Sequence, residues 1–490
     1  MNTGWPWSSQ ACATSDIERG SEEKARAGRR GLLRARALVS LLMLVSALAG
    51  TGSCGEIVAS GDLQAAIDGA MPGDTVMVPA GDYDPFTVDK ALTIQGIGSP
   101  SARARTQEPA ITIRADGVEF RGFEVVGVPR NQEDKFDYYM DQSSLKPYYT
   151  LNLPNSGILV DGDDVVIEDL YVEGSEAGIL VDGSRNFTII NSSFERCDRG
   201  LLLQDCDGGK IGGCSFCECA KFGAYLEGCD GISIEENLAT KNPGAGMMLK
   251  ESSNCLVRDN DFVENWQGLF LWNSTFCDLE KNRADRNVYY GIVVSSGSNN
   301  SIVDNLARKS GGGEYDLLGM GISIQENSSY NLVAGNVLEE NRNGLDVTRG
   351  CIFNLIFCNQ ISENSNGIRL DKNENNLVYK NNFNRNLITG YDNASHNFWN
   401  ATVGNYYDDY RGRDRDGDGV GDDPYWIPKG SSCAVDWRPL MQPAEVAIEP
   451  EKAREELARY ATYEAVEDLP YKVENDTIVI GKGEPAKWWI

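Results

Sequence analysis

A glycine recurs through the middle of this chain at nearly constant intervals, and this period constrains the fold more than any other feature. Successive glycines lie 21 to 23 residues apart, except for one step of 30; they are Gly157, Gly178, Gly200, Gly223, Gly246, Gly268, Gly291, Gly321, Gly344, Gly367 and Gly390. A second series runs in step with them: Asn191, Cys214, Asn237, Asn260, Asn282, Asn305, Asn336, Asn359 and Asn382. A fixed period of roughly 20 to 50 residues indicates a repeat architecture.

Each repeat is too short for a pair of helices and carries three short apolar groups, such as "GIRL", "NLVY" and "NNF" between Gly367 and Phe383. Apolar residues at alternating positions predict half-buried strands. Three such strands per repeat, stacked in parallel, form a β-helix, and parallel crossovers are right-handed in nearly all proteins. We therefore predict an all-β fold, a right-handed parallel β-helix of about 13 coils, from about Val76 to Trp399.

The repeated glycines and asparagines are interpreted as scaffold. Glycine opens each strand where the chain turns sharply. Asparagine at a turn tolerates the left-handed backbone region, and its side chain can bond to the equivalent asparagine one coil away. Leucine-rich repeats have a similar length, but their dense leucine pattern is missing here.

The two ends of the predicted β-helix differ from the repeats. "GDLQAAIDGA" predicts a short amphipathic helix near Asp62–Gly69, which would cover the open end of the stack. Beyond Met441 the repeat stops, and a helix and a short strand, "DTIVI", are expected. The expected organisation is an export segment (1–54), the β-helix (55–403), a calcium-loop closing segment (404–441) and a C-terminal helix and tail (442–490).

Three stretches resemble a known group of proteins: "LQAAIDGAMPGDTVMVPAGDY", the repeats, and "GNYYDDYRGRDRDGDGVGDDPYWIP" at residues 404–428. They are similar to exported right-handed parallel β-helix repeat proteins of the NosD-like, or carbohydrate-binding and sugar-hydrolysis, type. The resemblance implies the fold but no single activity, because one fold carries many functions. It also implies a role in copper handling, which a chain with one histidine, His396, and no Met/His-rich tract does not support.

The N-terminal sequence predicts export. A basic stretch, "RRGLLRAR", precedes an apolar run from Ala37 to Ala49, which is too short to span a bilayer and suits a signal peptide. We expect an extracellular or cell-envelope protein with no transmembrane anchor in the mature chain. The formal net charge of −28 repels polyanions, so nucleic acid is not an expected partner.

"DRDGDGVGDD" is the strongest chemical motif. Oxygen ligands at alternating positions, followed by a glycine, are the way in which a short loop wraps Ca²⁺. The predicted ligands of one structural calcium ion are Asp414, Asp416, Asp418, the Val420 carbonyl and Asp422. The bidentate glutamate of an EF-hand would fall at Tyr425, so the loop is closer to those of thrombospondin type 3 repeats. The alternative is a solvated acidic turn.

The chain has 13 cysteines, which in an exported protein would indicate disulfides. Several occupy equivalent coil positions, in the pairs Cys197 with Cys219, Cys206 with Cys229, and Cys255 with Cys277. In-register stacking of this kind suits small apolar residues in a core, so buried free thiols are expected. Some disulfides, or a metal site around Cys214–Cys219, are the alternatives.

The strand after each glycine has an unusual outward face. Its second and fourth positions must point outward, yet they are apolar or aromatic over much of the stack. Exposed apolar stripes mark binding sites, and the predicted ligand-binding stripe comprises Tyr225, Glu227, Lys250, Phe270 and Trp272. Two oversized turns, Pro129–Pro154 and the one before Gly321, are expected to overhang it. The alternative is that these loops or the C-terminal segment cover the stripe.

Paired carboxylates on the same face are candidates for acid–base catalysis. The candidate catalytic residues are Asp161, Asp182, Asp346, Arg369 and Asp371. Acidic residues are common in this chain, so chance pairs compete with this interpretation. We expect a protein that binds a polysaccharide or cell-surface glycan, or that builds the cell surface; the alternative is a polysaccharide lyase, hydrolase or epimerase that acts along the outer face.

Overall fold

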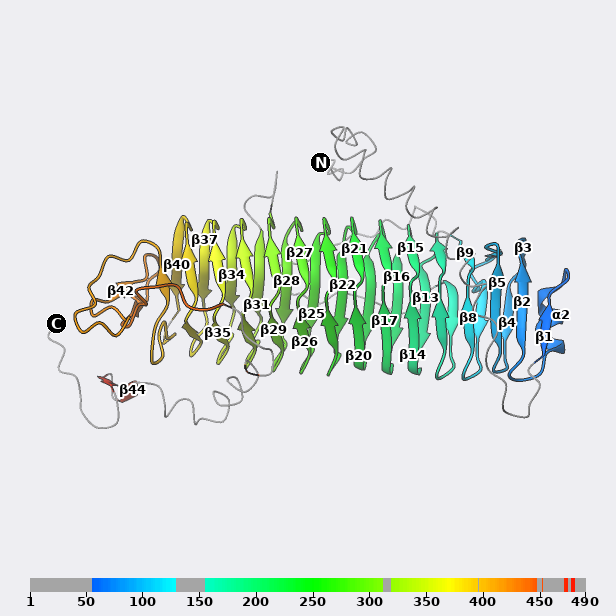
Figure 1. The fold of residues 1–490 in the computed structure, drawn as a ribbon, viewed down its shortest axis with the longest axis horizontal. Coiled ribbons are helices and arrows are strands. Elements are labelled where there is room, and N and C mark those ends of the chain that lie inside the picture. Colours follow the sequence, from blue (N-terminus) through cyan, green and yellow to red (C-terminus); the bar gives the residue numbers. More distant parts are fainter. Residues whose placement is uncertain are drawn as a thin grey trace, which may run out of the picture. The chain divides into compact units, whose positions relative to one another are not determined.

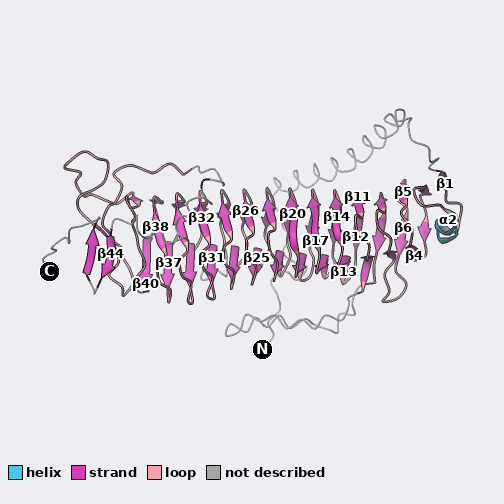
Figure 2. Cartoon of the chain, turned by 90° about the horizontal axis from the view of Figure 1, so that it is seen from below, coloured by secondary structure: helices cyan, strands magenta, loops and turns pink. Residues whose placement is uncertain are grey.

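The computed structural model describes residues 55–128, 155–311, 319–394 and 396–446, together with Lys452 and the backbone of two strands near the C-terminus. Through these residues the chain winds into stacked coils, whose strands form three long parallel sheets (Figures 1 and 2). The expected all-β parallel β-helix is confirmed. None of the described helices is long and apolar enough to cross a membrane. The predicted export segment lies outside the described residues.

Each coil contributes one strand to each sheet, and coils follow one another in chain order. Sheet 1 comprises β1 (Glu56–Val58), β2 (Thr75–Pro79), β5 (Thr93–Ile97), β8 (Glu119–Arg121), β11 (Val166–Glu168), β14 (Arg185–Ile190), β17 (Asp207–Gly212), β20 (Asp230–Glu235), β23 (Leu256–Arg258), β26 (Asp278–Glu280), β29 (Ser301–Val303), β32 (Leu332–Ala334), β35 (Leu355–Phe357) and β38 (Leu377–Tyr379).

Sheet 2 holds the strands that begin around the recurring glycines. It comprises β4 (Phe86–Val88), β7 (Ile111–Ile113), β10 (Ser156–Val160), β13 (Ala177–Asp182), β16 (Arg199–Gln204), β19 (Phe222–Glu227), β22 (Ala245–Lys250), β25 (Gln267–Trp272), β28 (Tyr290–Ser295), β31 (Met320–Gln325), β34 (Asn343–Thr348), β37 (Asn366–Asp371) and β40 (Ile388–Asn393).

Sheet 3 completes the coils with short strands. It comprises β3 (Asp82–Tyr83), β6 (Ser101–Arg103), β9 (Glu124–Val126), β12 (Tyr171–Glu173), β15 (Ser193–Glu195), β18 (Ser215–Cys217), β21 (Leu238–Thr240), β24 (Asp261–Val263), β27 (Arg283–Asp285), β30 (Leu306–Arg308), β33 (Val337–Glu339), β36 (Gln360–Ser362), β39 (Asn382–Asn384) and β41 (Tyr406–Tyr407).

The coils stack in register, so each strand residue lies beside its equivalent one repeat later. In sheet 2, for example, Ile179 pairs with Leu201, and Leu201 pairs with Ala224. All three side chains are fully buried. Because strand residues alternate between the two faces, the inward rows of the three sheets form one continuous apolar core along the stack.

The recurring glycines are required by the close approach of neighbouring coils. A Cβ atom on Gly200 would lie 2.5 Å from the carbonyl oxygen of Gly223, and one on Gly223 would lie 2.4 Å from that of Gly246. Neither glycine has a positive φ. The expectation that glycine marks a sharp turn is therefore wrong at these positions: a side chain is excluded because the next coil occupies its space.

The expected scaffold role of the asparagines is confirmed. Asn305 donates its backbone N–H and its side-chain Nδ2–H to the Oδ1 atom of Asn336, at 2.9 and 3.0 Å, and donates Nδ2–H to the carbonyl of Leu279 at 2.8 Å. The same pattern forms a ladder through Asn237, Asn260, Asn282, Asn305, Asn336, Asn359, Asn381 and Asn405. Two predicted rungs are off by one residue, since Ser192 and Asn381 occupy the positions assigned to Asn191 and Asn382.

The N-terminal end is capped as expected, although the stack begins earlier than predicted. Helix α2 (Leu63–Gly69) starts at Asp62, whose side chain accepts a hydrogen bond from the Ala65 N–H, and it buries Leu63 and Ile67. Strand β1 pairs in parallel with β2, so the first coil begins at Glu56 rather than near Val76. Strand β1 precedes helix α2, ahead of the first strand that the sequence pattern predicted.

The closing segment ends the asparagine ladder with a carboxylate. Strands β42 (Tyr425–Trp426) and β43 (Val435–Asp436) form an antiparallel hairpin. The buried Asp436 accepts hydrogen bonds from the backbone N–H of Asn405 (2.7 Å), the hydroxyl of Tyr407 (3.0 Å) and the N–H of Arg438 (2.9 Å). Asp436 therefore occupies the place that the next ladder asparagine would take.

Beyond the closing segment, strands β44 (Tyr471–Glu474) and β45 (Thr477–Ile480) pair with each other in an antiparallel hairpin. The short strand expected at "DTIVI" is thereby confirmed as β45. The helix expected after Pro450 lies outside the described residues, apart from Lys452.

Asp436 makes the stability of the closed end depend on pH. Burial raises its pKa to about 7, although the hydrogen bonds from Asn405, Arg438 and Tyr407 lower it. In the unfolded chain the carboxyl group loses its proton near its ordinary pKa of 3.8. The contribution of Asp436 to the free energy of unfolding is thus complete below about pH 4 and is lost as the pH rises towards 7.

We predict that the wild-type chain loses stability relative to Asp436→Asn between pH 4.5 and pH 8. This pH range extends to both sides of the raised pKa of Asp436, which is about 7. The amide cannot ionise, so the difference between the two unfolding free energies isolates this one group. Urea denaturation of both proteins across the pH range measures the difference. A constant difference would show that Asp436 does not titrate within it.

Candidate functional site

The outward face of sheet 2 contains a buried apolar patch, which we call the covered patch. The outward side chains of successive strands are 0 to 6% exposed; they are Leu180, Leu202, Tyr225, Met248, Phe270 and Val293. The exposed aromatic stripe expected from the sequence is therefore wrong for Tyr225 and Phe270, because both rings are buried. The two oversized turns expected to overhang it fall largely outside the described residues.

The polar members of the predicted stripe bond to one another. Lys250 forms an ion pair with Glu227, and its ammonium group lies 5.4 Å from the ring centre of Trp272. Glu227 also accepts a hydrogen bond from the hydroxyl of Tyr225 at 3.1 Å. Glu227, Lys250 and Trp272 are half-buried, so they form the edge of the covered patch rather than an open ligand site.

The last coils of sheet 2 carry a different outward surface, which is polar and partly open. The guanidinium of Arg369 donates to Asp346 on the preceding coil at 2.9 Å and to Asp371 on its own strand at 2.6 Å. Its carbon also lies 5.8 Å from the ring centre of Tyr391, one coil further on. The clustering of Asp346, Arg369 and Asp371 predicted from the sequence is therefore confirmed.

The two carboxylates of this polar cluster differ in environment. Asp346 is buried, and this burial raises its pKa, although the adjacent Arg369 lowers it. Asp346 also accepts a hydrogen bond from Asn343 at 3.3 Å, and Asp371 accepts one from Asn393 at 3.1 Å. Both carboxylates thus hold Arg369 in place between β34 and β40.

A groove of about 940 Å³ adjoins the polar cluster of Asp346, Arg369 and Asp371. The two meet at Asn393, which lines the groove and donates a hydrogen bond to Asp371. Its walls come from the turns after β34 and β37, the end of β40, and the loop between β42 and β43. The lining residues are Gly350, Ile352, Lys372, Asn373, Glu374, Asn393, Ala394, His396, Ser431 and Ser432. The hydroxyl of Ser431 donates to the side-chain oxygen of Asn393 at 2.6 Å, which ties the closing hairpin to the last coil.

Sequence reasoning missed most of this groove. His396, the single histidine of the chain, is exposed in the groove wall. Tyr391 could have been found, because it occupies the outward row that contains Asp346 and Arg369, one coil further along. The serines of the closing hairpin could not have been found, since no repeat relates them to the coils.

The other proposed catalytic pair, Asp161 and Asp182, lies at the start of the covered patch. Both carboxylates are exposed on neighbouring coils. Partial burial and the negative charges of Asp161 and Asp205 raise the pKa of Asp182. This arrangement is a row of like charges, and it lacks the arginine that organises the carboxylates of the polar cluster.

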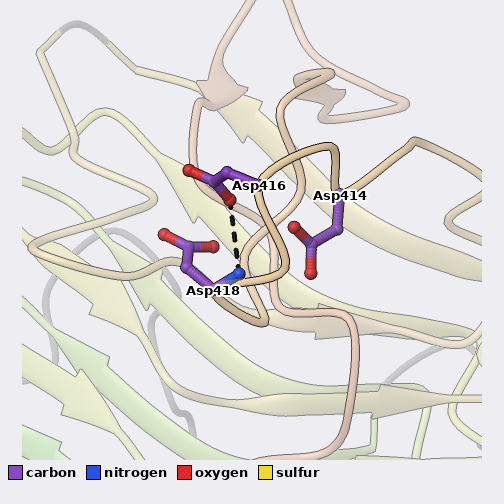
Figure 3. A group of neighbouring side chains, drawn as sticks. All are labelled: Asp414, Asp416 and Asp418. Carbon is purple, nitrogen blue, oxygen red and sulfur yellow. Dashed lines mark hydrogen bonds between the residues drawn. The ribbon is translucent and has the colours of Figure 1, made fainter.

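The predicted calcium loop brings three of its five proposed ligands together. Carboxylate oxygens of Asp414, Asp416 and Asp418 all lie within 4.8 Å of one another (Figure 3). Asp414 accepts backbone N–H bonds from Gly417 at 2.6 Å and Gly419 at 3.0 Å, which shape the loop. The three hard oxygen donors suit Ca²⁺.

The two remaining proposed ligands are placed differently. Asp422 accepts the backbone N–H of Arg415 at 2.6 Å and is outside the close group of three carboxylates. The N–H of Val420 donates to Asp418 at 2.8 Å, and Val420 forms an antiparallel bridge with Leu440. This bridge attaches the loop to the chain that closes the stack.

The burial of Phe270 generates a stability prediction. Phe270→Ala should lower the unfolding free energy by about 3 kcal/mol or more, because the substitution leaves a cavity in the covered patch. Phe276→Ala is the matched control, since that ring is 59% exposed and its removal should change stability little. Chemical denaturation measures both. Equal effects would mean that the patch is not packed in solution.

Comparisons with known proteins agree with this architecture. A model of the right-handed β-helix region matches residues 177–337, and the model for the periplasmic copper-binding protein NosD matches residues 309–412. No curated protein matches the sequence.

Solved structures similar to this chain include the A-module of mannuronan C-5 epimerase AlgE6 from Azotobacter vinelandii, with a TM-score of 0.47 and 12% identity over 69% of this chain and 92% of that one. The periplasmic alginate epimerase AlgG has a TM-score of 0.44 and 14% identity over 68% and 82%. These likenesses carry no information about activity. Together, the stacked parallel coils and the match to the right-handed β-helix model show a right-handed parallel β-helix, whose residues 309–412 are similar to NosD.

Proposed function

We propose that the protein is exported and binds a polysaccharide or cell-surface glycan at the polar cluster and the groove beside it. One observation carries this proposal: Arg369, fixed by two carboxylates, lies beside the half-buried ring of Tyr391, and Asn393, which bonds to one of these carboxylates, lines an open groove. Sugar rings present apolar C–H faces and many hydroxyl groups. An aromatic ring with neighbouring amide, hydroxyl and charged groups complements both.

The electrostatics favour binding over catalysis. General acid–base catalysis needs carboxyl groups that are free to exchange protons with the substrate. Asp346 is buried against Arg369, and Asp371 is bonded to both Arg369 and Asn393. These bonds position the guanidinium, whose remaining N–H groups can face a ligand. The net charge of −28 favours a neutral or cationic glycan over a polyanionic one.

The alternative is an enzyme that acts on a polysaccharide with Asp371 as its acid or base. The test that separates the two functions is a glycan array combined with a reducing-sugar assay on the same preparation. Binding without the release of reducing ends or unsaturated products supports the proposal. Turnover that disappears in Asp371→Asn would establish the alternative, and an absence of both binding and turnover would refute both.

The description of the NosD family names copper, but the metal-capable cluster within the described residues consists of three aspartates. Carboxylates are hard donors that suit calcium rather than copper(I). Asp414, Asp416 and Asp418 are the ligands proposed for a structural Ca²⁺, with Val420 and Asp422 as the remaining expected ligands. Its role would be to neutralise the crowded carboxylates and stiffen the closing segment.

Tyr391→Ala should weaken glycan binding about thirtyfold, the effect of truncating an aromatic anchor in a binding site. Tyr171→Ala is the control, because Tyr171 is also a half-buried outward tyrosine but lies on sheet 3. Affinity is measured by calorimetry on the best glycan from the array. If both variants bind like the wild type, the ligand site is elsewhere on the protein.

Calorimetry with CaCl₂ should detect one site, which Asp416→Ala abolishes, and chelation should lower the melting temperature of the wild type. Asp207→Ala, at an exposed carboxylate on sheet 1, should leave calcium binding intact. Binding in the wild type that survives Asp416→Ala would place the ion elsewhere. An unchanged melting temperature and no heat on titration would mean that the loop is an acidic turn.

A further inference from the structure

Two pairs of cysteines lie in adjacent coils at the same corner position. Cys206 and Cys229 precede the strands β17 and β20, and the N–H of Asp230 donates to the carbonyl of Cys206 at 2.9 Å. Cys255 and Cys277 precede the strands β23 and β26, and the N–H of Asp278 donates to the carbonyl of Cys255 at 2.9 Å. Within each pair, the Cα atoms are therefore separated by about one strand spacing, ~4.8 Å.

The thiols of each pair are in contact inside the core. Because the adjacent strands pair in register, each thiol has its partner's thiol as its neighbour in the next coil. All four side chains are at most 1% exposed. A Cα separation near ~4.8 Å falls within the range of about 4.4 to 6.8 Å that disulfides span. The backbone thus already holds both pairs at bonding separation.

Each cysteine pair occupies a row in which other coils are tied together by side chains. The row of Cys255 and Cys277 continues with Asn300, whose Oδ1 accepts the N–H of Cys277 at 3.0 Å. From Asn300 onward, the side chains of that row bond from coil to coil through Asn331, Asn354, Asn376 and Asn397. A thiol is only a weak donor and cannot build such a ladder. A covalent bond between the thiols would provide the missing link between coils.

We propose that Cys206 with Cys229, and Cys255 with Cys277, form two disulfides that staple neighbouring coils when the protein folds in an oxidising compartment. Forming each Sγ–Sγ bond removes one hydrogen from each thiol. The two electrons reduce a disulfide oxidant, such as oxidised glutathione, to two thiols, which also take up the two protons. All four cysteines are free thiols in the structure.

Burial determines when these bonds form. In the folded protein no oxidant reaches thiols that are at most 1% exposed. Exchange must therefore take place while the coils are stacking. A reducing compartment would give the same fold with four free thiols at these positions, which makes the two forms chemically distinct but structurally alike.

The test is to produce the protein once by secretion into an oxidising compartment and once in a reducing cytosol. Each sample is denatured in the presence of an alkylating agent, and its peptides are analysed by mass spectrometry. The secreted protein should yield the two cross-linked peptide pairs, and the cytosolic protein should yield none. Circular dichroism and limited proteolysis confirm that both samples are folded.

Single substitutions make the assignment specific. Cys229→Ser should remove only the Cys206 link, and Cys277→Ser should remove only the Cys255 link. Folding should be retained, because a serine, Ser252, already follows Cys229 in the row of Cys206 and Cys229. Cys214→Ser is the control, because the neighbour of Cys214 in the next coil is Asn237. Complete alkylation of all four cysteines in folded, secreted protein would overturn the proposal, as would a link from any of the four to a cysteine other than its partner.

Discussion

The structure depends on parallel hydrogen bonding between coils that are one strand spacing apart. This spacing leaves no room between the backbones at the recurring glycines, where the carbonyl of the next coil would lie 2.5 Å from a Cβ on Gly200. It also brings equivalent side chains into contact. Asparagine can donate to its copy above while it bonds to the backbone below, so a row such as Asn282, Asn305 and Asn336 becomes continuous. The repeat in the sequence follows from this contact between equivalent residues of neighbouring coils.

A stack of identical coils has open ends, and the protein closes each end differently. At the N-terminus, helix α2 buries Leu63 and Ile67 over the first coils. At the C-terminus, the β42–β43 hairpin inserts Asp436 as a last rung and stacks Tyr425 on Tyr407 with ring centres 3.7 Å apart. A carboxyl group has two acceptor oxygens and lacks the N–H groups with which an amide bonds to a further coil. It can therefore end a ladder that asparagine would continue.

The outward side chains are not subject to the constraint of coil spacing, and they differ along the stack. On sheet 2 they form the covered patch over β13–β28 and become polar at β34–β40, where Arg369 is held between Asp346 and Asp371. The closing hairpin adds Ser431 to the same surface. The proposed glycan site therefore lies where the repeat ends and the non-repetitive closing hairpin meets the outward face of the last coils.

The repeat period alone determined the fold, the parallel register and the inward rows, because equivalent residues must lie beside one another in a stack. Alternation along each strand likewise predicted that Asp346, Arg369 and Asp371 share a face. The burial of Tyr225 and Phe270 could not be predicted, since periodicity says which way a side chain points but not what packs on it. The groove at Asn393 and the ladder position of Asp436 were decided by the tertiary structure, because both require the non-repetitive closing hairpin to fold back onto the last coil.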